Sequence, residues 1–495
     1  MAYAITCEQL RAGLVSPAGC GARANGVTDD TLAIREALAR IAAQGGGTLW
    51  LPAGVYVVSP TETNGTIFAL CSDLRIVGAG IGQTAIKVKD SSPPYGAIFA
   101  GAADNLVVES LTIDGNVAGN PIADLAELMG GGPRFSISVI GAGVRIRDVE
   151  ITNQSAVNDL VLSGSDIRVD GCRWSNYGDD PNHIAHDASC IYTQSASGVR
   201  IEGCHFQGAA PGAPGARTAI ETHGSDHIIR GNVVKDFNAG VNVTGVATSD
   251  STGILVSGNV IEGASCGVLL WALAYYAHTS GFGIDGAVLE GNTIRLAQTG
   301  VWGGSDNYMA GIALYPLADL DVRGLKIRGN VIISPLEAEA IDANSVSCGI
   351  GWYSAAGKLL LDSDISSNTI VGFPMAGIRL SCGVRSVRVT DNQITNCGST
   401  LDAQNDSYKS PVFVALAEGS DGLLLDRNTI RDTNAVTRNK WGLNLWTAGI
   451  PRVYVLDNVV DVTGDAASFL APAYLSAGTA PTISRLWHNG IDVAA

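Results

Sequence analysis

Apolar and polar residues alternate in short stretches along most of the chain, and a recurring turn interrupts the alternation. The stretches are rich in Val and Ile, as in Ile228-Ile-Arg-Gly-Asn-Val-Val and Leu325-Lys-Ile-Arg-Gly-Asn-Val-Ile. An alternation of this kind is typical of β-strands, because the apolar positions of a helix recur about every 3.6 residues. The pattern therefore predicts short strands joined by turns that contain Gly-Asn or Asp-Asn.

The asparagines of these turns recur at intervals that fit the coils of a solenoid. Successive equivalents are 24 (392 − 368) to 38 (330 − 292) residues apart, and they are Asn232, Asn259, Asn292, Asn330, Asn368, Asn392, Asn428 and Asn458. Asn tolerates a left-handed backbone, and stacked equivalents can hydrogen-bond to one another. The repeat predicts an all-β fold, a single-stranded right-handed parallel β-helix (solenoid) of about twelve coils.

Residues before the first repeats form a separate pattern. A turn is followed by an amphipathic stretch, which predicts a capping helix over residues 29–43, with Thr28, Asp29 and Asp30 around its N-cap and an apolar face of Leu32, Ile34, Leu38 and Ile41. A solenoid needs such a cap over its open end. We expect residues 1–60 to form the N-terminal cap and first strands, 61–460 the β-helix, and 461–495 a C-terminal cap or subunit contact.

Two of these segments resemble a known family. The strings GARANGVTDDTLAIREAL (21–38) and GGGTLWLPAGVYVV (45–58) resemble the opening of the pectate-lyase superfamily of right-handed parallel β-helices, which includes polygalacturonases, mannuronan epimerases and bacteriophage tailspikes. Later repeats, such as Thr218-Ala-Ile-Glu-Thr-His-Gly and Gly267-Val-Leu-Leu-Trp, resemble phage tail proteins that degrade host polysaccharide. The resemblance covers about residues 20–460. It implies an extended polysaccharide as substrate and a homotrimer.

Composition narrows the choice of partner and location. The net charge of −16 disfavours nucleic acid and anionic membranes, whose phosphates would be repelled. The most apolar run, residues 266–277, is too short to span a bilayer, so we expect no membrane insertion. The N-terminus has no basic segment followed by a long apolar core, as a secretory signal would. Together with the family resemblance, this predicts an extracellular or virion-associated protein without a recognisable signal peptide.

The ten cysteines contain no CxxC pair and no zinc-ligand spacing. Cys172 and Cys204 occupy the turn position of the repeat in two successive coils, which predicts small buried filler. Cys7 and Cys20 are the one pair that we consider for a disulfide. His183, His186 and Asp187 have a spacing compatible with a divalent ion, but no helix fixes their directions, so we predict neither metal nor cofactor.

The strand before each Asn turn places alternate residues outward. Aligning these strands predicts outward pairs on successive coils: Val161 and Ser163, Tyr192 and Gln194, Glu221 and His223, Asn242 and Thr244, Leu269 and Trp271, Ala313 and Tyr315, Asp342 and Asn344, Arg379 and Ser381, Phe413 and Ala415, Asn444 and Trp446. Such a column is a track for an extended polymer. Its aromatic rings, including those of Tyr192, Trp271, Tyr315 and Trp446, suit stacking on sugars.

Long loops flank the same column at residues 176–187, 272–280 and 299–308. Loops on a rigid scaffold often carry binding sites. We therefore add to the predicted sugar-binding residues Tyr276, His278, Trp302 and Tyr308. Five of the seven histidines lie between residues 183 and 227, together with several carboxylates.

Hydrolysis of a glycosidic bond needs two carboxyl groups about 5 to 10 Å apart. Glu221 and a loop carboxylate of the preceding coil, Asp180 or Asp179, are predicted to be this pair. His223 is predicted to orient Glu221. Asp179-Asp180 and His223-Gly224 resemble the paired Asp and the His-Gly motif of polygalacturonases, although the other signatures of that family are not at matching places.

Two other functions fit the same residues. Tyr177-Gly-Asp-Asp-Pro-Asn-His183 is similar to the Tyr-Gly-x-Asp-Pro-His string of mannuronan epimerases, with one residue inserted before the His. This resemblance implies a lyase or epimerase with Tyr177, His183 and Arg217 as acid, base and carboxylate clamp. A non-catalytic glycan-binding tail adhesin would keep the aromatic residues but would have no need of clustered carboxylates.

Overall fold

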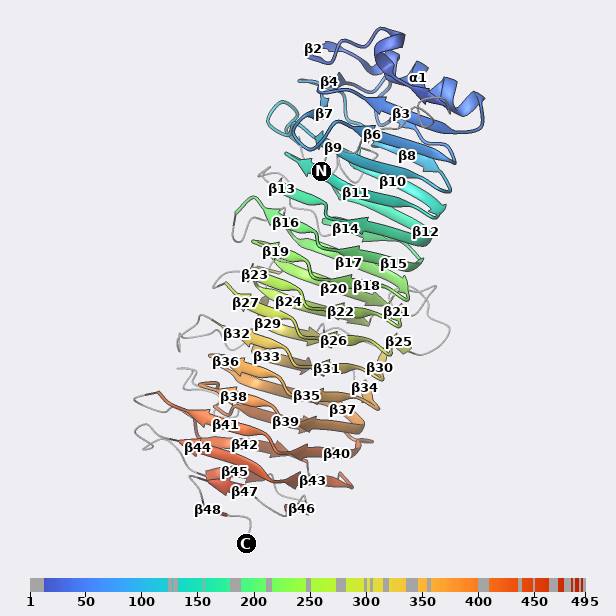
Figure 1. Ribbon diagram of the computed structural model, residues 1–495. Coiled ribbons are helices and arrows are strands. Elements are labelled where there is room, and N and C mark those ends of the chain that lie inside the picture. Colours follow the sequence, from blue (N-terminus) through green and yellow to red (C-terminus); the bar gives the residue numbers. More distant parts are fainter. Residues whose placement is uncertain are drawn as a thin grey trace. The chain divides into compact units, whose positions relative to one another are not determined.

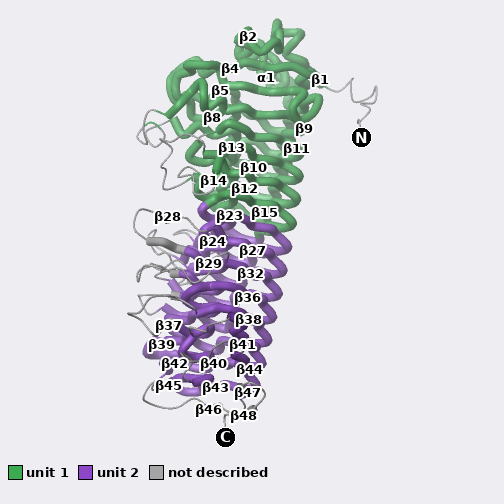
Figure 2. The backbone as a smooth tube through the Cα atoms, turned by 90° about the vertical axis from the view of Figure 1, so that its left-hand side faces the viewer, with its two compact units in different colours: residues 1–222, 227–237 green, residues 223–226, 238–495 purple. Residues whose placement is uncertain are grey.

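The computed structural model describes the following parts of the chain: residues 13–122, 127, 132–154, 156–178, 188–210, 216–245, 251–272, 282–297, 301–302, 306–314, 320–334, 346–353, 358–398, 409–434, 439–447, 450–462, 471–475, 482–483, 486–488 and 491–492. The chain divides into two compact units (Figure 2). Unit 1 comprises residues 1–222 and 227–237, and unit 2 comprises residues 223–226 and 238–495. The predicted boundaries at residues 60 and 460 remain predictions.

Parallel strands stack from coil to coil in both units, and Figure 1 shows them side by side. In unit 1, β12 (Asn158–Asp170) pairs with β14 (Ser189–Thr193), which pairs with β17 (Thr218–Ser225). In unit 2, β24 (Cys266–Ala272) pairs with β29 (Asp306–Leu314), which pairs with β33 (Val346–Tyr353). Each of these coils thus hydrogen-bonds to the next through its backbone, and the predicted all-β parallel solenoid is confirmed.

A single long helix, α1 (Thr31–Ala43), covers the first coils among the described residues. Ile34, Leu38 and Ile41 are buried, as predicted. The helix begins two residues later than predicted because Asp29 is the last residue of β2 (Asn25–Asp29) and Asp30 folds back on the turn before the strand. Asp30 accepts hydrogen bonds from the backbone N–H groups of residues 23 and 24, at 2.8 and 2.9 Å. Leu32 was wrongly placed on the apolar face: its side chain is 73% exposed.

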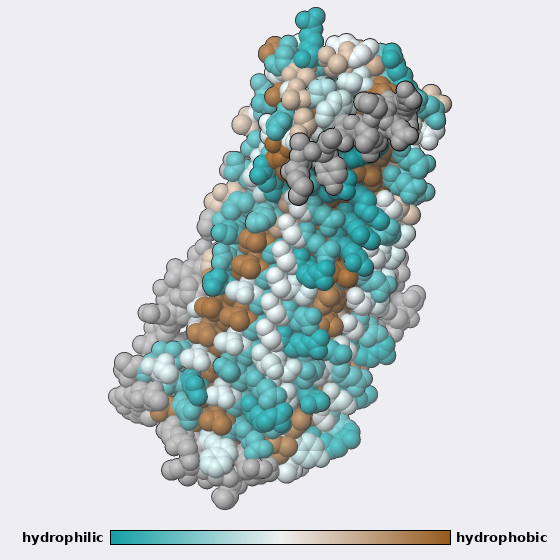
Figure 3. All heavy atoms as spheres, viewed as in Figure 1, coloured by the Kyte–Doolittle hydropathy of each residue, from teal (hydrophilic) through white to brown (hydrophobic). Residues whose placement is uncertain are grey.

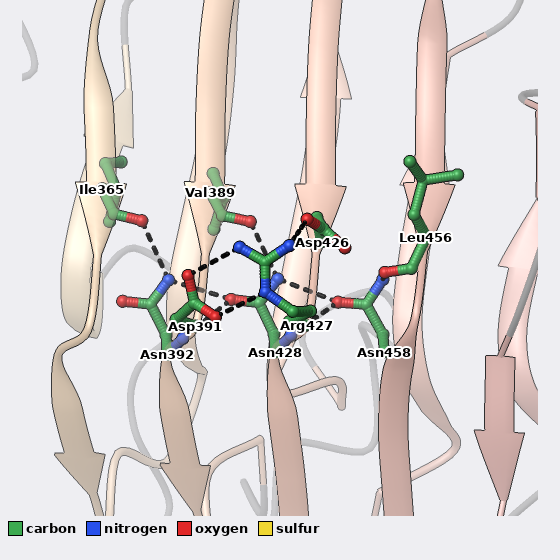
Figure 4. A network of polar contacts seen from close by, with 9 residues as sticks. All are labelled: Ile365, Val389, Asp391, Asn392, Asp426, Arg427, Asn428, Leu456 and Asn458. Carbon is green, nitrogen blue, oxygen red and sulfur yellow. Dashed lines mark hydrogen bonds and ion pairs between the residues drawn. The ribbon is translucent and has the colours of Figure 1, made fainter.

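The asparagine ladder is formed in unit 2 by the seven equivalents from Asn259 to Asn458. Around Asn428 (Figure 4), the side-chain N–H group donates to the carbonyl of Val389 at 2.8 Å and to Oδ1 of Asn458 at 2.9 Å. Oδ1 of Asn428 accepts from the backbone and side-chain N–H groups of Asn392, at 3.1 and 2.9 Å. The side chain of Asn428 therefore satisfies backbone groups of the preceding coil and hydrogen-bonds to the asparagine of the next coil. Buried polar groups need such partners.

Cysteines take the asparagine position in two coils of unit 1. Cys172 and Cys204 are buried, and the backbone N–H of Cys204 donates to Oδ1 of Asn232 at 2.9 Å. Burial is the main cause that raises the pKa of the Cys172 thiol well above its usual value, so this group is not a nucleophile at neutral pH. The predicted packing role is confirmed. Cys20 is a free thiol, and Cys7 lies outside the described residues.

Small turn residues leave a shallow groove on one face of unit 2. It follows the turns after β22 (Leu255–Ser257), β26 (Val288–Glu290), β31 (Lys326–Arg328) and β35 (Asp364–Ser366), and Figure 3 shows a pale stripe in this region. The turns use left-handed glycines such as Gly291, with φ of 62°. A Glu290–Arg328 ion pair lies in the groove. Its lining residues in the described part of the chain include no aromatic side chain, so it offers a sugar ring little to stack on.

Candidate functional site

Three strands of unit 1 bring the predicted outward residues into register. Val161 pairs with Tyr192, and Tyr192 pairs with Glu221. Adjacent strands lie about 4.8 Å apart, so these side chains are immediate neighbours. Ile191 and Ile220, the residues just before them, are fully buried, which places Tyr192 and Glu221 on the outer face. We call Val161, Tyr192 and Glu221 the outer column of unit 1.

Glu221 is sheltered although it belongs to the outer face, since only 9% of it is exposed. Tyr192 beside it is half-buried, and Gln194, which follows β14, is exposed. Arg217 precedes β17 and is half-buried. The arrangement therefore combines a sheltered carboxyl, an aromatic ring, an accessible amide and a guanidinium within two neighbouring coils. These are groups that bind and protonate sugars.

The partners predicted for Glu221 have different outcomes. His223 follows on the same strand and is 5% exposed, but residues 223–226 group with unit 2. Asp179, Asp180 and His183 lie outside the described residues. The carboxyl pair and the orienting role of His223 consequently stay predictions.

Unit 2 has an outer column of its own, in which the register joins Asn242, Leu269, Ala313, Gly351, Arg379, Phe413, Asn444 and Tyr474. The register corrects one predicted pair: Gly351 and Tyr353 hold the position that was assigned to Asp342 and Asn344. The sequence alignment erred there because a long insertion precedes the strand.

Within unit 2, Asn242 is buried, with 2% exposed, and Trp271 is half-buried. Trp302 and Tyr308 lie in β28 (Val301–Trp302) and β29, which pair as antiparallel strands. Tyr276, His278 and Tyr315 lie outside the described residues. Their contacts with a sugar remain predictions.

Tyr177 does not face the outer surface, which corrects its predicted contact with substrate. It is 1% exposed, its ring stacks on Phe237 with centroids 5.9 Å apart, and its hydroxyl donates to the carbonyl of Ala156 at 3.2 Å. The cause is a register shift after Trp174, where Asn176 adopts a φ of 53° and turns the next side chain inward. A ring in this position cannot protonate a polymer outside the coil.

Asp159 is a buried carboxyl that sequence reasoning missed. It is fully buried, and neither of its oxygens has a hydrogen-bond partner among the described residues. Burial raises the pKa of Asp159 well above its usual value, and the nearby indole of Trp174 offsets this only in part. The charge of Asp159 also raises the pKa values of Tyr177 and Cys190, for which burial is the larger cause. The only sequence signal was an acidic residue inside an apolar run, Val157-Asn-Asp-Leu-Val161.

The burial of Asp159 predicts a pH-dependent stability. The pKa of Asp159 in the folded state lies above the unfolded value of about 3.9. Its contribution to the free energy of unfolding is therefore fully present below about pH 3.9. The contribution is lost progressively as pH rises through the folded pKa. Asp159→Asn cannot ionise, so we expect its melting temperature to fall less than that of the wild type between about pH 4 and about pH 8.

The control for this experiment is Asp148→Asn, which changes an exposed carboxyl of the same unit. Its melting temperature should change with pH as that of the wild type does. An Asp159→Asn curve parallel to that of the wild type would show that Asp159 is ionised in the folded protein, contrary to this prediction.

Other site types find no support in the part of the chain that the structure describes. No three His, Cys, Asp or Glu side chains there are grouped as ligands of a metal ion. No helix in the same residues has the length and apolar character needed to cross a membrane.

Comparison with known proteins identifies the fold. Residues 96–281 match the family model "Right handed beta helix region". A mutant tailspike protein of E. coli bacteriophage HK620, solved in complex with a pentasaccharide, is similar with a TM-score of 0.58 at 14% identity, over 97% of this chain and 79% of that chain. At this identity the likeness concerns the fold alone. The chain is therefore a right-handed parallel β-helix that resembles tailspikes, as its sequence predicted.

Local sequence similarity points to enzymes of Azotobacter vinelandii. The chain is 38% identical to mannuronan C5-epimerase AlgE3 over 111 residues, which are 21% of this chain and 6% of that protein. It is 36% identical to mannuronan C5-epimerase AlgE4 over 102 residues, 19% of this chain and 18% of that protein. Alginate lyase 7 is 39% identical over 102 residues, 19% of this chain and 12% of that protein. The chain thus spans less than a fifth of the length of each.

Proposed function

We propose that the protein is a polysaccharide-degrading enzyme, a glycoside hydrolase that binds an extended glycan on the outer face of unit 1. The observation that carries this proposal is the register of Glu221 beside Tyr192 on the outer column. Glu221 is the one carboxylate on this column in the described residues, and the strand holds it on a rigid sheet, where a reacting group is positioned best. The names of the relatives, mannuronan epimerases and an alginate lyase, support a polysaccharide as the class of substrate.

In the proposed reaction, Glu221 exchanges a proton with the glycosidic oxygen or with the attacking water, and a second carboxyl takes the complementary role. Asp180 or Asp179 is the proposed second group. The ring of Tyr192 packs against a sugar, and Gln194 offers its exposed amide to sugar hydroxyls. Shelter from solvent strengthens the polar contacts of Glu221 because the local dielectric is low.

A lyase or epimerase acting on a uronate polymer is the second candidate, and the local identity to mannuronan epimerases favours it. In that reaction a base removes the proton next to the uronate carboxylate, and a cation neutralises the carboxylate. Arg217 and His183 keep their proposed roles as clamp and base. Tyr177 loses its role as acid, since its ring lies inside the coil.

Product analysis of the wild-type protein tests the proposal. The protein is incubated with a panel of soluble uronate, neutral and bacterial capsular polysaccharides. We expect new reducing ends without ultraviolet-absorbing unsaturated ends. Unsaturated ends would establish elimination, and an altered uronate composition without cleavage would establish epimerisation. Binding without any product would establish an adhesin, so each of these three outcomes would contradict the hydrolase.

The homotrimer and the extracellular or virion-associated location also stay proposals. They rest on the resemblance to tailspikes. The proposed reaction in unit 1 requires neither.

A further inference from the structure

The last coils of unit 2 carry aromatic side chains on the outer column, far along the chain from Glu221. β39 (Val412–Leu416), β42 (Trp441–Trp446) and β45 (Ala471–Leu475) pair in parallel, and Figure 2 shows them next to one another. Phe413 pairs with Asn444 and Asn444 with Tyr474, while Trp446 pairs with Ala415. We call Phe413, Trp441, Trp446 and Tyr474 the aromatic platform.

The ring of Trp446 is held in a fixed orientation. Its indole N–H donates to Oδ1 of Asn444 at 2.9 Å. The buried ring of Phe413 packs against it edge to face, with centroids 6.4 Å apart at 68°. Because two neighbours fix the indole, Trp446 loses little side-chain entropy when a ligand stacks on it.

The platform nevertheless faces solvent. Trp446 is 45% exposed and Tyr474 is 38% exposed. Tyr474 is supported in turn by Trp441, whose ring centroid lies 4.9 Å away. Exposed rings that are held rigid are more typical of a binding surface than of a packing defect, since isolated exposed aromatics lack such support.

Polar groups lie under and beside the rings. The guanidinium of Arg379 lies 5.8 Å from the centroid of the Phe413 ring, and its Nε donates to Oγ of Ser381 at 3.1 Å. Asn444 and Arg379 are both nearly buried, at 1% and 7% exposed. These nearly buried groups therefore support the rings from below, while Trp446 and Tyr474 are the groups that a ligand can reach.

We propose that the aromatic platform is a second glycan-binding site, in which a pyranose ring stacks its apolar C–H face on Trp446. The hydroxyls at the rim of such a ring need hydrogen-bonding partners, and the hydroxyl of the exposed Tyr474 is such a group on the platform. A stable protein partner would need about 800 Å² on this side. Trp446 and Tyr474 expose roughly 200 Å² between them, because an aromatic side chain buries about 150–250 Å² in full.

This site shares with the proposed function only the class of ligand, a polysaccharide, and does not depend on Glu221. The platform belongs to unit 2, whereas Glu221 belongs to the outer column of unit 1. Binding and cleavage can therefore be measured separately.

Affinity electrophoresis tests the site. The full chain is run in native gels that each contain alginate, polygalacturonate, dextran or a bacterial capsular polysaccharide. We expect one of these to retard the wild type, and Trp446→Ala to weaken that binding about tenfold. Trp487→Ala is the matched control: it removes a tryptophan that is 37% exposed on β47 (Leu486–His488), which pairs with β44 (Asn458–Val462) and not with the platform strands. It should bind like the wild type.

Three results would overturn the inference. In the first, none of the polysaccharides retards the wild type. In the second, the wild type and Trp446→Ala bind equally well. In the third, Trp487→Ala loses as much binding as Trp446→Ala. Sedimentation would also overturn the inference if the wild type and Trp487→Ala formed an oligomer and Trp446→Ala did not. The platform would then bind a second copy of the chain. Trp446-dependent binding without cleavage would refute the proposed hydrolase but leave the platform intact.

Discussion

Asn428→Ala is expected to lower the free energy of unfolding of unit 2 by about 2–4 kcal/mol. The side chain of Asn428 donates two hydrogen bonds and accepts two, all in a buried ladder (Figure 4). Its removal leaves the Val389 carbonyl and the Asn392 amide without these partners, and each buried unsatisfied group costs about 1–3 kcal/mol. Thermal or denaturant unfolding followed by circular dichroism measures the change.

Arg427→Ala is the control, because Arg427 lies in the same turn but on the surface. Its guanidinium forms ion pairs with Asp391 and Asp426, and its side chain is 53% exposed. The pair with Asp391 is exposed on both sides and contributes little, whereas Asp426 is only 10% exposed and loses a partner. The melting temperature should therefore fall by less than in Asn428→Ala. Both residues 427 and 428 keep a β-carbon in these variants, so the left-handed turn at residue 427, with φ of 52°, is not altered. If the free energy of unfolding fell equally in the two variants, the asparagine ladder would not be what stabilises this turn.

The coil repeat was predictable because its signal is local. An apolar pair, a turn residue and an asparagine recur together, and the structure places Asn292, Asn330 and Asn368 in one hydrogen-bonded ladder. The outer column was predictable for the same reason, since alternation along a strand fixes which side chains share a face. Val161, Tyr192 and Glu221 follow from it.

The errors arise where a local signal fails, as at irregular backbone, after an insertion, or at a residue type in an unusual environment. A register shift and the left-handed Asn176 after Trp174 turn Tyr177 inward, and an asparagine by itself does not distinguish such a shift from the regular turns of the repeat. Asp342 and Asn344 were assigned to a strand that starts later, at Val346, because insertion length does not follow the repeat. Asp159 was missed because an acidic residue in a strand is ordinarily exposed.

Glu221→Gln is expected to reduce polysaccharide cleavage at least about 100-fold, the range for loss of an acid–base group. The amide has nearly the same shape as the carboxyl but transfers no proton. Glu221 lies on a paired strand beside Tyr192, so the fold and the binding of the glycan should persist. The loss is expected in kcat, with little change in KM or melting temperature.

Glu202→Gln is the matched control for this variant. Glu202 is a partly buried carboxylate of unit 1 on β15 (Ala196–Glu202), where it pairs with Arg230 at 2.5 Å, away from the outer column. Its activity should equal that of the wild type, whereas Asp180→Asn should be as damaging as Glu221→Gln if Asp180 is the second carboxyl. A Glu221→Gln protein that kept most of its activity would remove the carboxyl from the mechanism. The reacting groups would then be sought at Arg217 and His183, where a clamp and a base favour elimination over hydrolysis.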